Sequence, residues 1–468
     1  MNYTPLLTDL YQFTMAYGYW QLGMHEQNAN FHLFFRQNPF KGHYALSCGL
    51  GSVVEFLENW HFGVEQIDYL RRLESPDGQA LFPEAFLDYL ANLKFTCDLE
   101  AVPEGTIVFP NIPLIRIQGP LLQCQLLETP LLNMINFQTL IATKASRVCL
   151  AAENDPVIEF GMRRAQGPDG ALSASRAAYI GGCVGTSNTL AGQLYDIPVR
   201  GTHAHSWVTA FPDEKTAFAA YAKVMPHNSV LLVDTYNTLD GIKHAIEIGK
   251  HLRQQGNDLL GVRLDSGDLA ALSIKARDLL DAAGFEKTII LASNSLDEYI
   301  IADLKKQGAK ISAWGVGTSL VTAYDQPALD GVYKLSAIQN KDGSWEHKLK
   351  LSEQSIKTSN PGRQQVRRFF KEGIPVTDVI YDIELGIDNA LFDYDDYLDL
   401  LTPIFQQGLI VKQAPSIHMI REKAKVAIDT FNTVCQNTAH TTELEKRLSN
   451  LKNKMIQEKS GTDHRAAR

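Results

Sequence analysis

Side chains that could do chemistry recur at the ends of short apolar runs in the middle of the chain. His203 and His205 stand two residues apart in Gly201-Thr-His-Ala-His-Ser, and Asp234 ends the apolar run that begins at Val230. Side chains of an extended segment alternate with a period of two, so the two histidines would point the same way. Metal ligation, ordinary hydrogen bonding and a reactive imidazole oriented by Asp234 all fit this pattern.

A cation and a carboxylate occur together in Gly261-Val-Arg-Leu-Asp-Ser-Gly-Asp. The period of two puts Arg263 and Asp265 on one face of a strand. A structural salt bridge at the strand end is one interpretation. In the other, Arg263 binds an anionic substrate group, while Asp265 accepts from sugar hydroxyls, holds Mg²⁺ or stabilises developing positive charge.

Two further segments have residue types that suit a planar or phosphorylated anion. Gly315-Val-Gly-Thr-Ser follows an apolar run, an arrangement in which backbone N–H groups can cradle a phosphate. It lacks both the lysine of a P-loop and the third glycine of a dinucleotide fingerprint. Phe160 and Arg163, in Glu159-Phe-Gly-Met-Arg-Arg, offer an aromatic face beside a guanidinium, although core packing would also explain Phe160.

The elements that must position these groups are short strands that alternate with helix-compatible segments from about residue 155 onward. This alternation is typical of a parallel sheet built from βαβ units. A barrel would bring all the strand ends to one point, whereas a doubly wound open sheet is the alternative. We predict the α/β class, with an irregular TIM-like α/β barrel and a flanking α+β domain. The predicted strands are 157–161, 197–202, 230–236, 260–265, 288–294, 311–318 and 332–337.

The rest of the chain shows a different pattern of apolar residues. Residues 29–128 mix extended runs with helical patterns, which indicates an α+β unit. We therefore predict an N-terminal α+β domain at 1–135, an α/β barrel domain at 136–359 and a C-terminal extension at 360–468, part of which could complete the first domain.

Composition excludes several classes of protein. The 44 Lys and Arg against 53 Asp and Glu give a net charge of −9, which disfavours non-specific binding to nucleic acid. The six cysteines form no C-x-x-C pair, so a zinc ribbon or a dense disulfide scaffold is not indicated. The start lacks a basic region, and no uninterrupted apolar stretch reaches about 18 residues. We expect a cytoplasmic protein with no nucleic-acid or membrane partner.

Six segments, in this order, resemble the nicotinate phosphoribosyltransferase family, which comprises type II phosphoribosyltransferases. The resemblance implies an enzyme of NAD salvage that forms nicotinate mononucleotide and diphosphate from nicotinate and 5-phosphoribosyl diphosphate, with Mg²⁺. It also implies ATP as a co-substrate, hydrolysed through a phosphohistidine, and a homodimer with shared active sites. The segments are Leu7-Thr-Asp-Leu-Tyr-Gln, Glu159-Phe-Gly-Met-Arg-Arg, Gly201-Thr-His-Ala-His-Ser, Asp234-Thr-Tyr, Gly261-Val-Arg-Leu-Asp-Ser-Gly-Asp and Gly315-Val-Gly-Thr-Ser.

The resemblance further implies a role for particular residues of this sequence. His205 would be the phosphorylated histidine, Asp234 its partner and Asp265 the contact to the ribose diphosphate. Tyr11 would reach the partner's pocket and sandwich the pyridine ring against Phe160. The other implied substrate-binding residues are Arg163, Ser187, Thr202 and Arg263, and the implied phosphate-binding residues are Asn294, Gly317 and Thr318. No residue is assigned to a metal.

Alternatives to this function remain at the level of sequence. A nicotinamide-using relative would carry a carboxylate at the position of Ser187, in Val184-Gly-Thr-Ser-Asn. A carboxylate there would repel nicotinate, whereas a hydroxyl can donate to it, so the acid is the favoured substrate. A metal-dependent barrel hydrolase built on His203 and His205, and a non-catalytic metabolite-binding module, are the other two alternatives.

Overall fold

The computed structural model describes residues 3–352, 358–435 and 440–463. The chain divides into two compact units: unit 1 comprises Met1–Leu140 with Ala328–Arg468, and unit 2 comprises Ile141–Pro327. Unit 1 is built mainly on antiparallel strands and unit 2 on parallel strands, so the chain has the α/β character expected from its sequence. Both ends of the chain therefore contribute to unit 1, while unit 2 is one continuous segment.

Unit 2 contains a six-stranded parallel sheet in the order β7-β6-β11-β10-β9-β8. Of the strands that the structure describes, β7 and β8 are its edges, and no ladder joins them into a closed ring. One isolated parallel bridge, Thr186 to Val199, extends beyond β7. The strands are β6 (Val157–Glu159), β7 (Gly185–Thr186), β8 (Val230–Leu232), β9 (Gly261–Leu264), β10 (Ile289–Ser293) and β11 (Ala313–Val316).

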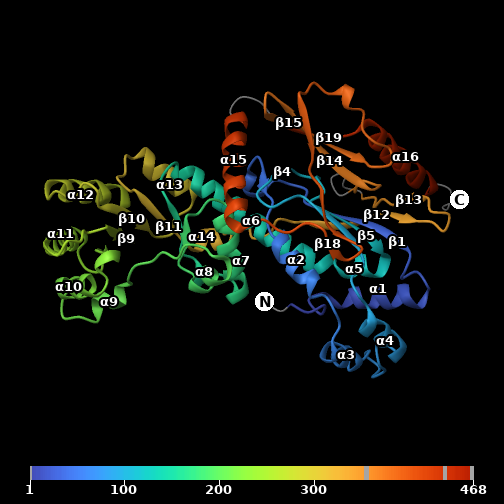
Figure 1. Ribbon diagram of the computed structural model, residues 1–468, viewed down its shortest axis with the longest axis horizontal. Coiled ribbons are helices and arrows are strands. Elements are labelled where there is room, and N and C mark those ends of the chain that lie inside the picture. The colour runs from blue at the N-terminus through green and yellow to red at the C-terminus, as the bar shows by residue number, and fades with distance from the viewer. Residues whose placement is uncertain (1–2, 353–357, 436–439, 464–468) are drawn as a thin grey trace. The chain divides into compact units, whose positions relative to one another are not determined.

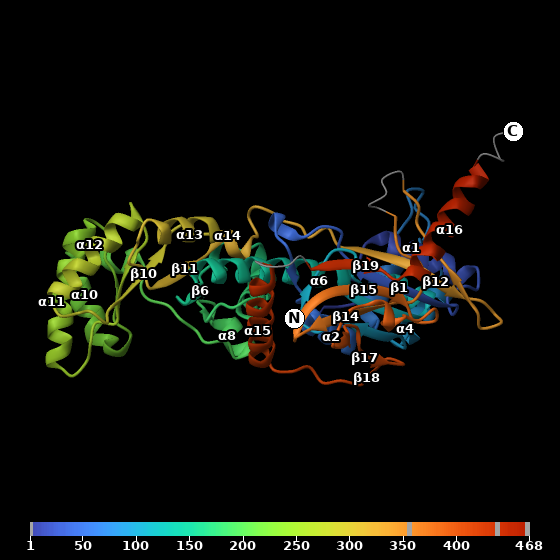
Figure 2. The ribbon, with the colours of Figure 1, turned by 90° about the horizontal axis from the view of Figure 1, so that it is seen from above.

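Helices lie around this sheet (Figures 1 and 2), as the alternating sequence pattern predicts. Helix α7 packs against β6 and β7, α11 against β9, and α12 against β10. Five of these helices begin at an Asn or Asp whose side chain accepts a backbone N–H: α8, α10, α11, α12 and α13. The helices are α7 (Gly167–Ile180), α8 (Thr189–Tyr195), α9 (His205–Thr209), α10 (Glu214–Val224), α11 (Thr238–Gln254), α12 (Leu269–Ala282), α13 (Glu298–Lys306) and α14 (Thr318–Val321).

Two of the seven predicted strands differ from the structure. Residues 197–202 contribute only the single bridge at Val199. Residues 332–337 lie in β12 (Val332–Gln339), which pairs antiparallel with β1 (Asn28–Phe34) in unit 1. An apolar run in the sequence does not reveal which sheet the strand joins. Strand β7 was not predicted, because its two residues include no apolar side chain.

Unit 1 contains three sheets. The largest is antiparallel in the order β13-β12-β1-β5-β3-β17-β18, the second has the order β16-β14-β15-β19, and β2 pairs with β4. Besides β1 and β12, the strands are β2 (Ala45–Leu46), β3 (Asp98–Ala101), β4 (Ile107–Val108), β5 (Ile115–Pro120), β13 (Trp345–His347), β14 (Gln364–Lys371), β15 (Ile374–Asp382), β16 (Asp396–Asp399), β17 (Thr402–Gln406), β18 (Leu409–Ile410) and β19 (Thr441–Leu444).

Unit 1 contains helices as well as strands, as the mixed pattern of residues 29–128 indicates. Among the described residues, no helix is both long and apolar enough to cross a membrane. Helix α6 runs through the boundary at residue 140 into unit 2. The helices are α1 (Leu10–Gln21), α2 (Leu50–Glu58), α3 (Val64–Arg71), α4 (Glu84–Asn92), α5 (Leu121–Leu126), α6 (Glu128–Ala152), α15 (Ile417–Cys435) and α16 (Lys446–Asp463).

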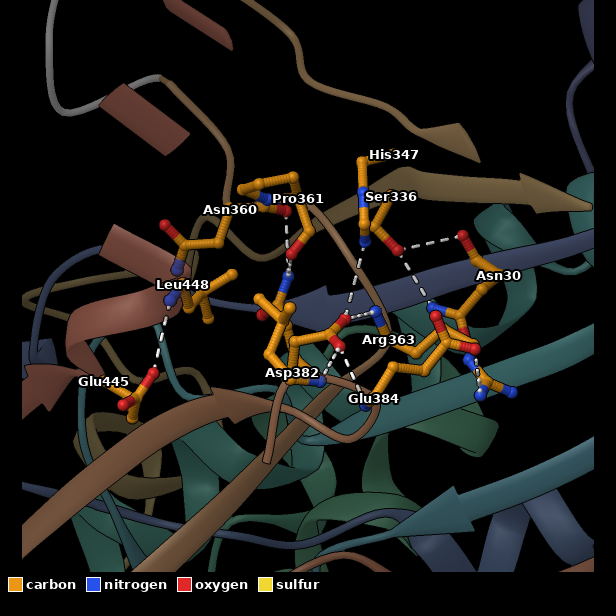
Figure 3. Close-up of polar contacts among 12 residues, drawn as sticks. Asn30, Ser336, His347, Asn360, Pro361, Arg363, Asp382, Glu384, Glu445 and Leu448 are labelled. Atoms are coloured by element: carbon orange, nitrogen blue, oxygen red, sulfur yellow. Dashed lines mark hydrogen bonds and ion pairs between the residues drawn. The ribbon is translucent and has the colours of Figure 1, made fainter. Parts of the chain in front are cut away.

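Polar contacts join the two ends of the chain within unit 1 (Figure 3). The buried Asp382, at the end of β15, accepts the backbone N–H of Arg363 at 2.7 Å and that of Glu384 at 2.8 Å. In the same region, the amide of Asn30 in β1 donates to the hydroxyl of Ser336 in β12 at 2.9 Å. The bond from Asn30 to Ser336 joins β1 to β12, and the backbone N–H of Gln364 donates to His32 Nε2 in β1 at 3.1 Å. The bonds of Asp382 lie within the C-terminal segment itself.

A glycine allows helix α11 to approach the sheet closely, and its replacement tests this packing. A Cβ at Gly241 would overlap the backbone carbonyl of Val233. We expect Gly241→Ala to lower the free energy of unfolding by roughly 1–3 kcal/mol, because a backbone group cannot rotate away. The measurement is urea denaturation followed by circular dichroism.

The matched control is Gly170→Ala in helix α7, where a Cβ would meet nothing within 4 Å. It should leave stability unchanged or raise it by up to about 1 kcal/mol. Equal midpoints for the two variants would contradict the close approach of α11.

Candidate active site

The predicted residues of unit 2 gather at one edge of its sheet. Because all six strands are parallel, their carboxyl ends lie at the same edge, where open α/β sheets bind their ligands. Each strand is followed within two residues by a predicted site residue: Phe160 after β6, Ser187 after β7, Asp234 after β8, Asp265 after β9, Asn294 after β10 and Gly317 after β11.

Arg263 and Asp265 meet at this edge, as their spacing predicted. Arg263 Nη2 donates to Asp265 Oδ1 at 2.9 Å, and Arg263 Nε donates to Ser293 Oγ at 2.7 Å. The Ser293 hydroxyl donates in turn to Asp265 Oδ1 at 2.5 Å. The guanidinium carbon of Arg263 also lies 5.5 Å from the centre of the Phe160 ring. An aromatic face and a cation are therefore presented together, as a planar anion requires.

His205 presents an accessible imidazole at the same edge. Its Nδ1 lies 3.1 Å from Thr235 Oγ1, its Nε2 lies 3.7 Å from Asp265 Oδ2, and its side chain is 45% exposed. Asp234 has different neighbours: its Oδ2 accepts the backbone N–H of Asp265 at 2.8 Å and the Ser266 hydroxyl at 2.6 Å. Within the described part of the chain, no hydrogen bond joins His205 to Asp234. The polar neighbours of the imidazole are Thr235 and Asp265.

His203 is a structural residue in this arrangement. It is buried, its Nε2 accepts the backbone N–H of Leu232 at 3.3 Å, and its ring packs edge-on against Tyr221 at 4.7 Å. Burial lowers the pKa of His203, which favours the neutral imidazole that this acceptor role needs. The two histidines therefore do not offer a pair of free nitrogens. No group of three or more His, Cys, Asp and Glu that could hold a metal occurs among the residues that the structure describes.

Two carboxylates could nevertheless share a hard cation with a substrate. Asp234 Oδ1 is buried and has no hydrogen-bond partner in the described residues. Asp265 Oδ2 faces His205, and the Asp265 side chain is 29% exposed. Mg²⁺ is commonly held by one or two carboxylates together with substrate phosphates, so this pair fits it.

Sequence reasoning missed the role of Glu159, the last residue of β6. Its fully buried carboxylate accepts the hydroxyls of Ser175 at 2.8 Å and Thr186 at 2.5 Å, and also the backbone N–H of Gly161. Its carbonyl accepts the N–H of Ser187 at 2.9 Å. One residue thus fixes the turns after both β6 and β7. The signal in the sequence was a carboxylate inside an apolar run, which must find buried donors.

Glycines make room for the Phe160 ring. A Cβ at Gly315 would lie 2.5 Å from Phe160 Cδ2, so the ring can lie against β11 only because this position has no side chain. Gly317 and Thr318 are half-buried at the start of the short helix α14. Their backbone N–H groups follow directly from β11, the strand against which the ring lies.

The remaining predicted residues occupy more open positions. Arg163 lies in the turn Met162–Arg164 and is exposed, as is Asn294 after β10. The Thr202 hydroxyl donates to the carbonyl of His203 at 3.2 Å. Tyr11 belongs to unit 1, where it is 48% exposed on helix α1.

Comparisons with known proteins agree in one family. The sequence model of the nicotinate phosphoribosyltransferase (NAPRTase) N-terminal domain matches residues 6–136, and that of the nicotinate phosphoribosyltransferase (NAPRTase) family matches residues 156–374. The nicotinate phosphoribosyltransferase of Bacillus subtilis is 44% identical over 435 residues, covering 89% of this chain and 87% of that protein. The Homo sapiens nicotinate phosphoribosyltransferase is 37% identical over 443 residues, covering 82% and 81%.

A solved structure gives the same result. The crystal structure of human nicotinic acid phosphoribosyltransferase superimposes with a TM-score of 0.82 at 31% identity, covering 96% of this chain and 99% of that one.

The hydrogen bonds of Glu159 can be tested by its replacement with glutamine. The Gln amide can accept at only one oxygen, so Glu159→Gln leaves at least one buried donor poorly paired. We expect the free energy of unfolding to fall by about 1–3 kcal/mol. Amide hydrogen exchange should also become faster at Gly161 and Ser187, while exchange in helix α12 is unchanged. Equal exchange at Gly161 and Ser187 in the two proteins would contradict the positioning role.

Proposed function

The chain belongs to the nicotinate phosphoribosyltransferase family, and we propose that it joins the ring nitrogen of nicotinate to the phosphoribosyl group of 5-phosphoribosyl diphosphate, releasing diphosphate. The product would be nicotinate mononucleotide, within the salvage of NAD. The observation that carries the proposal is the placement of the Arg263 guanidinium 5.5 Å from the Phe160 ring, beside the carboxylate of Asp265.

Nicotinate is a flat ring with a carboxylate, and the residues at the sheet edge match both parts. Phe160 offers its face to the pyridine ring. Arg263 uses two of its N–H groups on Ser293 and Asp265, and a guanidinium has five. The remaining N–H groups, together with Arg163 and the Ser187 hydroxyl, can donate to the carboxylate of the substrate. Thr202 would add a further substrate contact.

The reacting sugar needs a different environment. As the bond between ribose C1 and diphosphate breaks, positive charge develops on the ribose and negative charge on the leaving group. Asp265 can stabilise the first charge, and Mg²⁺, held by Asp234 and Asp265, would neutralise the second. Asn294 and the N–H groups of Gly317 and Thr318 are suited to hold phosphate oxygens.

ATP coupling would use His205. Its imidazole attacks the γ-phosphorus of ATP, the bond to the bridging oxygen breaks, ADP leaves, and water later hydrolyses the phosphohistidine. The accessible side chain and the hydrogen bond of Nδ1 to Thr235 support this role, because that bond leaves Nε2 as the nucleophile.

The proposal also includes an assembly and a location for the enzyme. The active sites would be shared across a homodimer in the cytoplasm, with Tyr11 of each chain reaching the ring pocket of the other. Its exposure on helix α1 is compatible with such a contact.

The substrate is tested by assay of the purified chain with 5-phosphoribosyl diphosphate, Mg²⁺ and ATP. We expect nicotinate to give nicotinate mononucleotide, measured by chromatography, and nicotinamide to give little product. Ser187→Asp should lower kcat/KM for nicotinate by at least about tenfold, because two like charges would face each other at close range. Ser187→Ala is the control that removes the hydroxyl without adding charge. Preference of the unaltered chain for nicotinamide would refute the proposal.

The phosphoacceptor is tested by labelling with γ-³²P ATP. The unaltered chain should carry acid-labile label, and His205→Ala should carry none, because it lacks the nucleophilic nitrogen. His227→Ala, at an exposed histidine of the same unit, should be labelled normally. Label retained in His205→Ala would assign the phosphoryl group to another residue.

A further inference from the structure

Unit 1 contains a cavity that the proposed reaction does not use. Its volume is about 420 Å³, which lies in the range of roughly 300–1,000 Å³ typical of small-molecule sites. A smaller cavity of about 230 Å³ adjoins it. The two share Pro103, Thr402, Lys412 and Lys423 among their lining residues, so a pair of lysines stands where they meet.

The lining of the larger cavity is rich in aromatic and aliphatic side chains. It is formed by the segment around β4, by strands β14 to β16 and by helix α15, which runs beside β4 and β15 (Figure 1). The rings of Phe109 and His440 stack with their centres 4.2 Å apart and an angle of 18° between them. The ring centre of Phe431 lies 5.3 Å from that of Phe109. These rings offer aromatic contacts to an apolar ligand body.

One of the cations that line the cavity is already neutralised. Arg368 donates through Nε and Nη2 to the two oxygens of Asp378, both at 2.7 Å. His440 Nε2 lies 3.4 Å from the same carboxylate. Asp378 is fully buried, so it serves this internal cluster and is not available to the lysines.

The two lysines have no such partner. Lys423 Nζ donates to the hydroxyl of Thr106 at 2.8 Å and to the carbonyl of Glu104 at 3.5 Å, both neutral oxygens. The nearby carboxylate of Glu104 accepts the backbone N–H of Gly49 at 2.7 Å instead. In the part of the chain that the structure describes, neither Lys412 nor Lys423 has a carboxylate oxygen within ion-pair distance.

The electrostatic consequence is visible at Lys423. Lys423 is exposed, but the atoms packed around its ammonium partly remove that group from water. This burial, followed by the charges of Lys412 and Arg368, lowers the pKa of Lys423 to about 8. Lys412 and Lys423 are both exposed, and they present two cations at one cavity. The carboxylate of Asp399 also lines this cavity, but it pairs with Arg367 at 2.8 Å. An anion in the cavity would therefore be attracted by both ammonium groups.

We propose that this cavity binds an amphipathic organic anion, whose carboxylate or phosphate lies between Lys412 and Lys423 and whose flat apolar body packs against Phe109 and Phe431. The site lies entirely within unit 1, so it is separate from the sheet edge that carries Phe160 and Arg263.

The proposal is tested by calorimetric titration of the full chain with three probes: naphthalene-2-carboxylate, 2-naphthyl phosphate and the neutral naphthalene-2-carboxamide. At least one anion should bind about tenfold or more tightly than the amide, as expected where a charged hydrogen bond forms. Lys412→Met and Lys423→Met should each weaken that anion by a similar factor, while leaving the weak binding of the amide unchanged. Tighter binding of the carboxylate or of the phosphate distinguishes the two headgroups.

Two further variants complete the design. Lys425→Met removes an exposed charge from the same helix outside the cavity and should bind like the unaltered chain. Ala427→Trp fills the cavity and should abolish binding of both anions. Anion binding that survives in Lys412→Met/Lys423→Met, equal affinity for the amide and the anions, or no binding by the unaltered chain would each overturn the proposal.

Discussion

The carboxylate of Asp265 joins the ends of three neighbouring strands. It accepts hydrogen bonds from Arg263 in β9 and from Ser293 at the end of β10. The backbone N–H of Asp265 donates to the carboxylate of Asp234, beyond β8. Parallel pairing imposes this meeting, because it brings all carboxyl ends to one edge. Of the proposed site residues, Arg263, Asp234 and His205 all lie against Asp265.

Glu159 performs the corresponding task on the other side of the sheet. Its buried carboxylate and carbonyl hold the turns after β6 and β7, which carry Phe160 and Ser187. Strand β11 lies between β6 and β10, and the Phe160 ring rests against it at Gly315. Glu159 fixes the turn that carries the Phe160 ring, and Asp265 fixes the Arg263 guanidinium. The ring and the guanidinium therefore approach each other from two halves of the sheet.

Net charge says little about either anion site. The chain carries a charge of −9, yet the proposed substrates are anions and two lysines line the unit 1 cavity. Charges farther apart than about 8–10 Å are largely screened at physiological salt, so the local arrangement of donors decides what binds. Arg263 forms an ion pair with Asp265, whereas Lys412 and Lys423 have no ion-pair partner among the described residues.

Local pattern was enough to determine the class of the fold and the family, and it predicted which residues form the site. Apolar runs alternating with helices predicted the parallel sheet, period-two spacing predicted that Arg263 and Asp265 point together, and the six motifs indicated the family. Only the tertiary structure decided which strands are neighbours. It placed residues 332–337 in the antiparallel sheet of unit 1, bound His203 to the backbone of Leu232, and put Thr235 and Asp265 beside His205 where Asp234 was expected. Spacing along a strand reveals the face on which a side chain lies, but contacts between residues about 30 positions apart depend on strand order and turn geometry, which no local pattern encodes.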